Sequence, residues 1–146
     1  MNERNVMSER NDPRVHFGGA FSDLIDELRS ENIFENLAQI AMFCATLGFE
    51  KRTTSSRTRS KYDVRYSLLR SVRGGETLIN AIALANAEFP VTTDPLGAEN
   101  LDNRLKAFEE FCNGGLLVIK NKHVAGVNLH QVIADISNEY MRSKEQ

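Results

Sequence analysis

Residues 36–49, NLAQIAMFCATLGF, set the architecture of this chain of 146 residues. Apolar side chains recur there at the three- and four-residue spacing of one helix face: Leu37, Ile40, Ala41, Cys44 and Leu47. Met42, Phe43 and Ala45 are apolar on another side, so we expect a central helix over 36–47 that is apolar nearly all round. Gly48 is placed for a left-handed C-cap, with Phe49 supplying the hydrophobic contact that often follows one.

Other segments on both sides of this stretch have helical patterns as well. Apolar stripes predict helices over 21–29, 76–89 and 101–112, and a last helix that begins near Asn128 as N-cap. We expect the sequence NGG at 113–115 to interrupt the pattern before a further apolar segment, and glycine doublets ordinarily end helices or form turns.

One segment fits two structures. Within residues 62–69, Tyr62, Val64 and Tyr66 alternate with polar neighbours as in a short strand, whereas Leu68 and Leu69 suit a helical turn equally well. Both readings stay open. The fold class we predict is all-α or strongly α-rich, with about six helices in one compact domain and room for one or two short strands near 62–69.

Length and composition bound the organisation of the chain. A chain of 146 residues with 41% hydrophobic and 26% charged residues is typical of one globular domain. We expect a flexible N-terminal arm at 1–17, a single helical domain at 18–142 and a frayed tail at 143–146. The first residues lack the apolar core of a secretory signal and no apolar run reaches membrane-spanning length, so the expected location is cytoplasmic, without membrane contact.

The charge is distributed unevenly although its net value is −2. Residues 50–73 hold eight bases and two acids, whereas residues 76–110 hold seven acids and two bases. Within the first segment, the loop 51–61 (KRTTSSRTRSK) has five basic and no apolar side chains, so we expect it to be exposed and mobile. Candidate phosphate-binding residues in and beside it are Lys51, Arg52, Arg57, Arg59, Lys61 and Arg65.

Catalytic and metal-binding patterns are missing from the sequence. The three histidines have no metal-ligand spacing relative to one another or to the cysteines, and no phosphate-binding glycine motif occurs, so we expect neither a metal nor another cofactor. Cys44 and Cys112 each lie in an apolar helical pattern, which favours reduced, buried thiols. A metal-dependent hydrolase would need some of four candidate carboxylates to converge on a metal ion, of which usually one or two are ligands. We expect separate faces for the four: Asp63, Glu76, Glu109 and Glu110.

The order of three motifs resembles a known family. ATLGF at 45–49 ends one helix, LINAIALA at 78–85 forms another, and AFEEFCNGGLLVI at 107–119 is the most specific stretch. Together they resemble the DNA phosphorothioation-associated protein 4 family, small accessory proteins found with bacterial Dnd sulfur-modification and restriction systems. The resemblance covers about residues 21–136 and brings no catalytic residues with it, and the basic loop is longer here than in the family pattern.

This resemblance implies an accessory role in DNA modification and restriction, and so in phage defence. The missing chemistry and the uneven charge favour a non-enzymatic adaptor that binds other proteins of the same system. The alternative is a direct, sequence-independent DNA binder that uses the basic loop. The oligomeric state stays open.

Overall fold

The computed structural model describes residues 12–56, 61–86, 96–97, 100–123 and 127–145, which form six α-helices, one 3-10 turn and a two-stranded sheet. The elements in chain order are β1 (Arg14–His16), η1 (Gly19–Phe21), α2 (Ser22–Ser30), α3 (Leu37–Glu50), β2 (Asp63–Arg65), α4 (Tyr66–Ser71), α5 (Gly75–Ala85), α6 (Leu101–Lys122) and α7 (Leu129–Glu145). The predicted fold class, a strongly helical protein with short strands, is confirmed.

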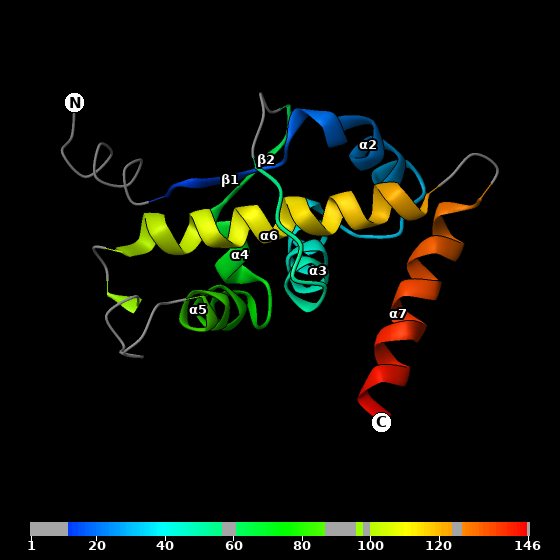
Figure 1. The fold of residues 1–146 in the computed structure, drawn as a ribbon. Coiled ribbons are helices and arrows are strands. Elements are labelled where there is room, and N and C mark those ends of the chain that lie inside the picture. Colours follow the sequence, from blue (N-terminus) through cyan, green and yellow to red (C-terminus); the bar gives the residue numbers. More distant parts are fainter. Residues whose placement is uncertain (1–11, 57–60, 87–95, 98–99, 124–126, 146) are drawn as a thin grey trace.

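The core is organised around the crossing of α3 and α6. In Figure 1 the long helix α6 runs across the molecule and α3 passes behind it at a steep angle. The two-stranded sheet and α2 lie on one side of α6, and α5 lies on the other, while α7 leaves the far end of α6 and points away from the sheet. Ile40, Cys44, Phe108, Cys112 and Leu116 are completely buried where the two long helices meet.

Gly48 does not end its helix. α3 continues to Glu50, and the left-handed backbone conformation occurs later, at Arg52, whose φ is 52°. A Cβ at Gly48 would lie only 2.0 Å from the carbonyl oxygen of Phe111 on α6. The prediction of a C-cap was therefore wrong, because this glycine is required for the close approach of two helices rather than for a turn.

The expected break at 113–115 was wrong for a related reason, since α6 is continuous from Leu101 to Lys122. A Cβ at Gly115 would lie 1.9 Å from the carbonyl oxygen of Cys44 on α3. The buried side chain of Asn113 accepts a hydrogen bond from the Gly18 amide (2.7 Å) and donates to the carbonyl of His16 (3.1 Å). Tertiary contacts thus stabilise three residues whose helix propensities are poor.

The N-terminal segment contributes to the core. β1 pairs with β2 in antiparallel register, with Val15 opposite Val64, and both side chains are buried together with Phe17. Residues 14–17 therefore differ from the flexible arm expected over 1–17, because a three-residue strand in polar sequence gives no periodic signal of its own. Both readings of 62–69 hold in succession, since β2 ends at Arg65 and α4 begins at Tyr66.

The last helix begins where the sequence predicts. The side chain of Asn128 accepts a hydrogen bond from the amide of His130 (2.8 Å), as an N-cap does. Leu129, Val132 and Ile136 are buried, whereas residues 137–144 are exposed, and the helix ends at Glu145. Residues 1–11, the predicted helix end at 87–89 and residue 146 lie outside the described residues.

Candidate functional site

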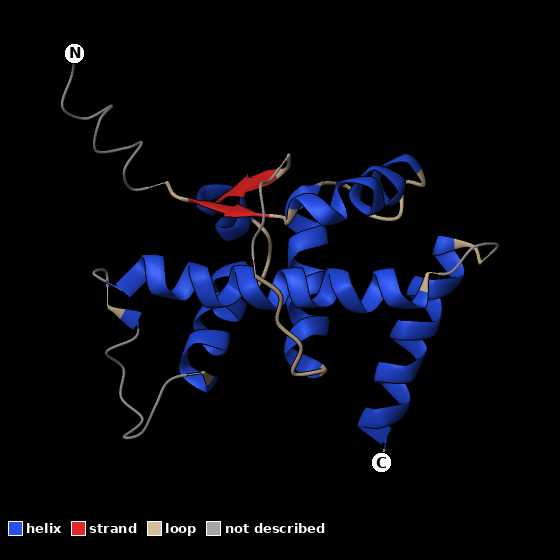
Figure 2. Cartoon of the chain, turned by 45° about the horizontal axis from the view of Figure 1, so that its top comes forward, coloured by secondary structure: helices blue, strands red, loops and turns tan. Residues whose placement is uncertain are grey.

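The segment after α3, residues 51–56, is called the strap here because it crosses α6 on the face opposite α3 (Figure 2). The amide of Thr53 donates to Gly48 (2.8 Å) and the amide of Ser55 donates to Glu110 of α6 (3.0 Å). A Cβ at Gly114 would come within 1.8 Å of the Thr53 carbonyl oxygen, so the strap lies directly on α6. Glycine thus lets the backbone of residues 53–55 dock on α6 without apolar side chains. The mobility expected of the loop stays a prediction.

At the start of the strap, the basic side chains already have partners. The Nζ of Lys51 lies 3.1 Å from a carboxylate oxygen of Glu139 on α7, and the Nζ of Lys122 lies 3.4 Å from the other. The hydrogen bond from Lys51, reinforced by the charge of Lys122, lowers the pKa of Glu139. The guanidinium of Arg52 stacks on the Phe49 ring at 4.8 Å from its centroid.

The other end of the basic segment lies beside α2 and the sheet. Lys61 pairs with Asp26 at 3.6 Å and also lies over the Tyr62 ring. The Tyr62 hydroxyl donates a hydrogen bond to Asp26, and this bond is the main reason why the pKa of that carboxyl is lowered, with the charge of Lys61 adding to it. Arg65 is exposed on β2.

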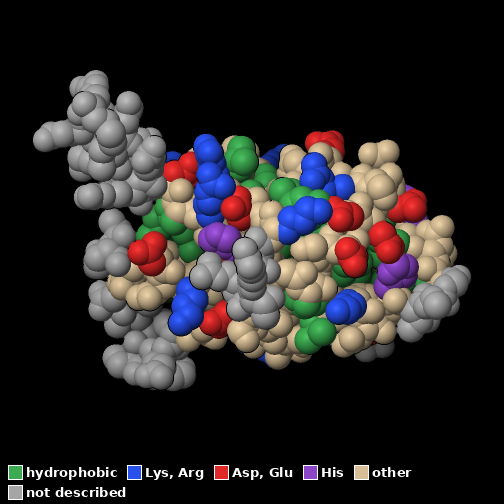
Figure 3. Space-filling view, turned by 90° about the horizontal axis from the view of Figure 1, so that it is seen from above, with side chains coloured by type: hydrophobic (Ala, Val, Ile, Leu, Met, Phe, Trp, Pro, Cys, Tyr) green, Lys and Arg blue, Asp and Glu red, His purple; other side chains and the backbone are tan. Residues whose placement is uncertain are grey.

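The four described members of the six predicted phosphate-binding residues therefore have different neighbours. Lys51 pairs with Glu139 of α7 and Arg52 stacks on Phe49 of α3. Lys61 instead pairs with Asp26 of α2, and Arg65 lies on β2. Arg57 and Arg59 lie outside the described residues. Figure 3 shows that on the face with the sheet and α2 the basic and acidic side chains alternate. Nucleic-acid binding by these six residues stays a prediction.

The carboxylates of the hydrolase hypothesis have separate local partners. Asp63 accepts a hydrogen bond from Arg14 (2.9 Å), Glu76 pairs with Arg70 (3.9 Å), and Glu109 faces His16 at 4.0 Å. Within the described residues, no group of three or more His, Cys, Asp or Glu side chains could hold a metal ion. Both cysteines are free thiols and buried, as predicted, and burial raises the pKa of each.

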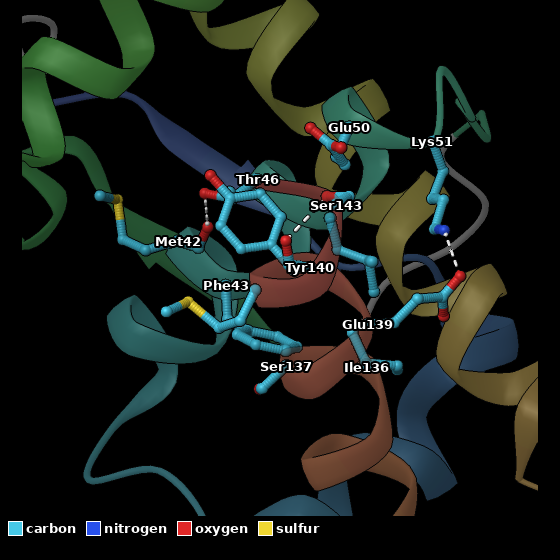
Figure 4. Close-up of a pocket in the computed structure, with 12 residues that line it drawn as sticks. Met42, Phe43, Thr46, Glu50, Lys51, Ile136, Ser137, Glu139, Tyr140 and Ser143 are labelled. Atoms are coloured by element: carbon cyan, nitrogen blue, oxygen red, sulfur yellow. Dashed lines mark hydrogen bonds and ion pairs between the residues drawn. The ribbon is translucent and has the colours of Figure 1, made fainter. Parts of the chain in front are cut away.

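An apolar groove lies between α3 and α7, with a volume of about 430 Å³, and is called the α3–α7 groove. Figure 4 shows Tyr140 of α7 reaching toward α3 beside Met42, Phe43 and Thr46. The exposed fraction is 38% for Tyr140 and 60% for Met141, which are large values for side chains of this size and polarity. The groove is lined by Met42, Phe43, Thr46, Leu47, Glu50, Lys51, Ile136, Ser137, Glu139, Tyr140, Met141 and Ser143.

The polar groups of the groove are largely engaged. Thr46 donates its hydroxyl to the Met42 carbonyl (2.8 Å) and Ser143 donates to the Tyr140 carbonyl (2.7 Å), each within its own helix. Lys51 and Glu139 pair at the rim. A small-molecule site needs convergent polar groups to orient its ligand. The groove offers instead a broad apolar floor with methionine side chains that adapt to a partner's shape.

Sequence reasoning missed this groove although part of its signal was visible. The sequence places Met42 and Phe43 on a second apolar side of the central helix. One apolar face is enough to pack against a core, so this second side was a sign of a further apolar surface. Tyr140 continues the stripe of Leu129, Val132 and Ile136, and periodicity alone does not show that this end of α7 is exposed in the described structure.

The described residues thus form a strongly helical protein with an apolar groove between α3 and α7, and they contain no metal-ligating cluster. The chain belongs to the family described as DNA sulphur modification system-associated protein 4, whose model matches residues 14–146. This confirms the resemblance found in the sequence and associates the chain with a DNA sulphur modification system. Comparison with curated proteins finds no match, and comparison with solved structures finds none either. No helix among the described residues has both the length and the hydropathy needed to cross a bilayer.

Proposed function

We propose that the protein is a non-enzymatic adaptor that binds another protein of a DNA sulphur modification system through the α3–α7 groove. The observation that carries this proposal is the exposure of Tyr140 and Met141 over an apolar floor, where a monomer would be expected to cover such side chains. The family's association with the modification system supports the choice of partner. A protein that serves DNA modification acts in the cytoplasm, and its wider role is in restriction and phage defence.

The occupant that suits the groove is one amphipathic helix of the partner protein. α3 and α7 diverge on either side of the groove, so a third helix could pack against both in the manner of helix-in-groove recognition. Lys51 and Lys122 share one carboxylate at the rim, and Lys144 lies over the Tyr140 ring at 5.2 Å. The two lysines that share the Glu139 carboxylate, together with Lys144 over the Tyr140 ring, favour a partner helix with acidic residues along its edge.

The test is co-purification with the other proteins of the system expressed together. Tyr140→Ala combined with Met141→Gln removes the exposed apolar surface without touching the buried residues of α7, so we expect the complex to be lost while the circular dichroism spectrum is retained. Asn138→Ala, also exposed on α7 but outside the groove lining, is the matched control and should co-purify like the original protein. Undiminished co-purification of the double variant would overturn the proposal.

Direct DNA binding remains the second candidate, and one observation favours it. Arg65 is exposed, forms no ion pair with another described residue, and lies directly opposite the exposed Arg14 in the sheet. If the basic residues make three to five phosphate contacts, log K should fall against log salt with a slope of roughly −3 to −4.5. Arg57→Ala with Arg59→Ala should flatten that slope by about two units, and no binding at about 50 mM salt would discard this candidate.

A further inference from the structure

Within the described parts of the chain, β2 pairs only with β1, so no described strand occupies its outer edge, and a recess lies beside that edge. We propose that this edge is a second docking site, which binds an extended segment of a partner protein by adding a strand to the sheet. The segment would place one apolar side chain in the recess and an acidic side chain beside Arg65. This site is separate from the α3–α7 groove, and the inference does not depend on the function proposed for that groove.

The register shows which main-chain groups of β2 face outward. Phe17 donates its amide to the Tyr62 carbonyl (3.0 Å) and Tyr66 donates to the Pro13 carbonyl (2.8 Å). Because hydrogen-bonded and non-hydrogen-bonded pairs alternate in an antiparallel ladder, Asp63 and Arg65 occupy non-hydrogen-bonded positions. Their main-chain groups therefore point away from β1.

Three of these groups are available to a new strand: the amide and carbonyl of Asp63 and the amide of Arg65. No other described residue forms a main-chain hydrogen bond with these three groups. The carbonyl of Arg65 is not counted among them because Arg65 is the N-cap residue of α4. The outer edge of β1 differs, because the carbonyl of His16 accepts a hydrogen bond from Asn113 of α6. An open strand edge is a template for pairing with another chain.

The recess beside β2 has a volume of about 510 Å³ and lies between β2 and α4 on one side and the α2–α3 connection on the other. Leu68 lines it and is 53% exposed, the second-largest exposed fraction among the large apolar side chains of the described residues. A residue paired opposite Val64 would point to the same side of the sheet as Val64, which also lines the recess. Further apolar lining comes from Phe34, Leu37 and Val72.

Charge on the other side of the sheet defines the neighbouring residue of the segment. Arg14 and Arg65 are directly opposite each other, an arrangement that destabilises a sheet when the charges are alike. Arg14 is paired with Asp63 (2.9 Å), but Arg65 has no ion pair with another described residue. A carboxylate entering opposite Arg65 would pair with it, and a basic residue two positions along would face Asp63. In antiparallel pairing the segment therefore reads acidic, apolar, basic.

The probe is an acetylated and amidated peptide of sequence TTELKVT, with TTKLEVT as a control of identical composition and inverted charge order. Amide resonances of the isotope-labelled full chain would report binding. We expect TTELKVT to bind weakly, with a high micromolar Kd, and to slow hydrogen exchange at the amides of Asp63 and Arg65. TTKLEVT should bind at least about fivefold more weakly.

Two variants make the test specific. Leu68→Gln leaves the main-chain edge intact and should weaken TTELKVT by about five- to tenfold. Arg65→Glu should remove the preference between the two peptides while both still bind, which a loss of folding would not do. The groove variant Tyr140→Ala with Met141→Gln should bind TTELKVT unchanged, so failure here is distinguishable from failure of the proposed function.

Three results would overturn the proposal. One is the absence of protection at Asp63 and Arg65 with TTELKVT at millimolar concentration. Another is equal binding of the two peptides. The last is a concentration-dependent dimer, observed by sedimentation, that protects the same amides without any peptide, because the edge would then pair with a second copy of this chain.

Discussion

Gly115→Ala perturbs the crossing of α3 and α6 at its tightest point. The added Cβ would lie 1.9 Å from the carbonyl oxygen of Cys44, 2.6 Å from its carbonyl carbon and 2.8 Å from its Cα. All three are main-chain atoms of α3, so no side-chain rotation relieves the clash. The two helices would have to separate by about 1.5 Å to restore an ordinary contact.

The sign of the change in unfolding free energy for Gly115→Ala distinguishes a close helix crossing from an effect of helix propensity alone. In an exposed helix, glycine to alanine stabilises by about 1 kcal/mol. Overpacking a core costs about 1–3 kcal/mol, and a clash between two main chains belongs at the upper end of that range. We therefore expect a net loss of about 2 kcal/mol, which for a chain of this size lowers Tm by about 4–8 °C.

Urea and thermal unfolding followed by circular dichroism would measure this difference. Gly18→Ala is the matched control, because its nearest neighbour would be the Phe21 ring at 3.3 Å, a side chain that can shift. The control should change Tm by no more than a degree or two, since such adjustments cost well under 1 kcal/mol. A Gly115→Ala variant as stable as the original protein, or more stable, would refute the close-crossing account.

Three further predictions concern buried groups and charges. Asn113→Leu should destabilise by about 2–4 kcal/mol in urea unfolding, because the Gly18 amide and the carbonyl of His16 lose a buried partner; a loss below about 0.5 kcal/mol would contradict the described network. Tyr62→Phe should raise the pKa of Asp26 in an NMR titration, since the hydrogen bond from the Tyr62 hydroxyl is the main cause of the lowered pKa. The stabilisation that this lowered pKa provides is present above the unfolded-state pKa of Asp26 and is lost as pH falls through the folded-state pKa. An Asp26 pKa that is the same in the variant would count against that hydrogen bond. Cys44 and Cys112 should not react with a thiol reagent at pH 8 until the chain is unfolded, because burial raises the pKa of both thiols; rapid reaction of the native protein would show that the crossing opens.

The helices were predictable from the sequence because their apolar periodicity is a local property. α3 shows this best, since a helix apolar on nearly all sides has to be central. Glycine positions were misread because the same residue type serves a C-cap and a close helix crossing. At Gly48 and Gly115 the deciding contact comes from a helix far away in the sequence, and no local pattern contains it.

The candidate sites were less accessible to sequence reasoning. The groove exists because the part of α7 around Tyr140 is exposed in the described structure. This exposure is set by tertiary packing, and the apolar stripe that ends at Tyr140 does not show it. The open edge depends on β1, a strand of three residues whose partner lies beyond α3 in the chain. The basic loop was visible in composition, but composition did not show that Lys51 and Lys61 are paired with carboxylates from other helices.

Photo-crosslinking from the α3–α7 groove tests the central claim most directly. p-Benzoylphenylalanine would replace Met141 in one variant and Asn138 in another, each expressed together with the other proteins of a DNA sulphur modification system. The account predicts an adduct from position 141 with one of those proteins, identified by mass spectrometry, and none from position 138. Adducts of equal yield from both positions, or none from position 141 while the proteins still co-purify, would contradict it.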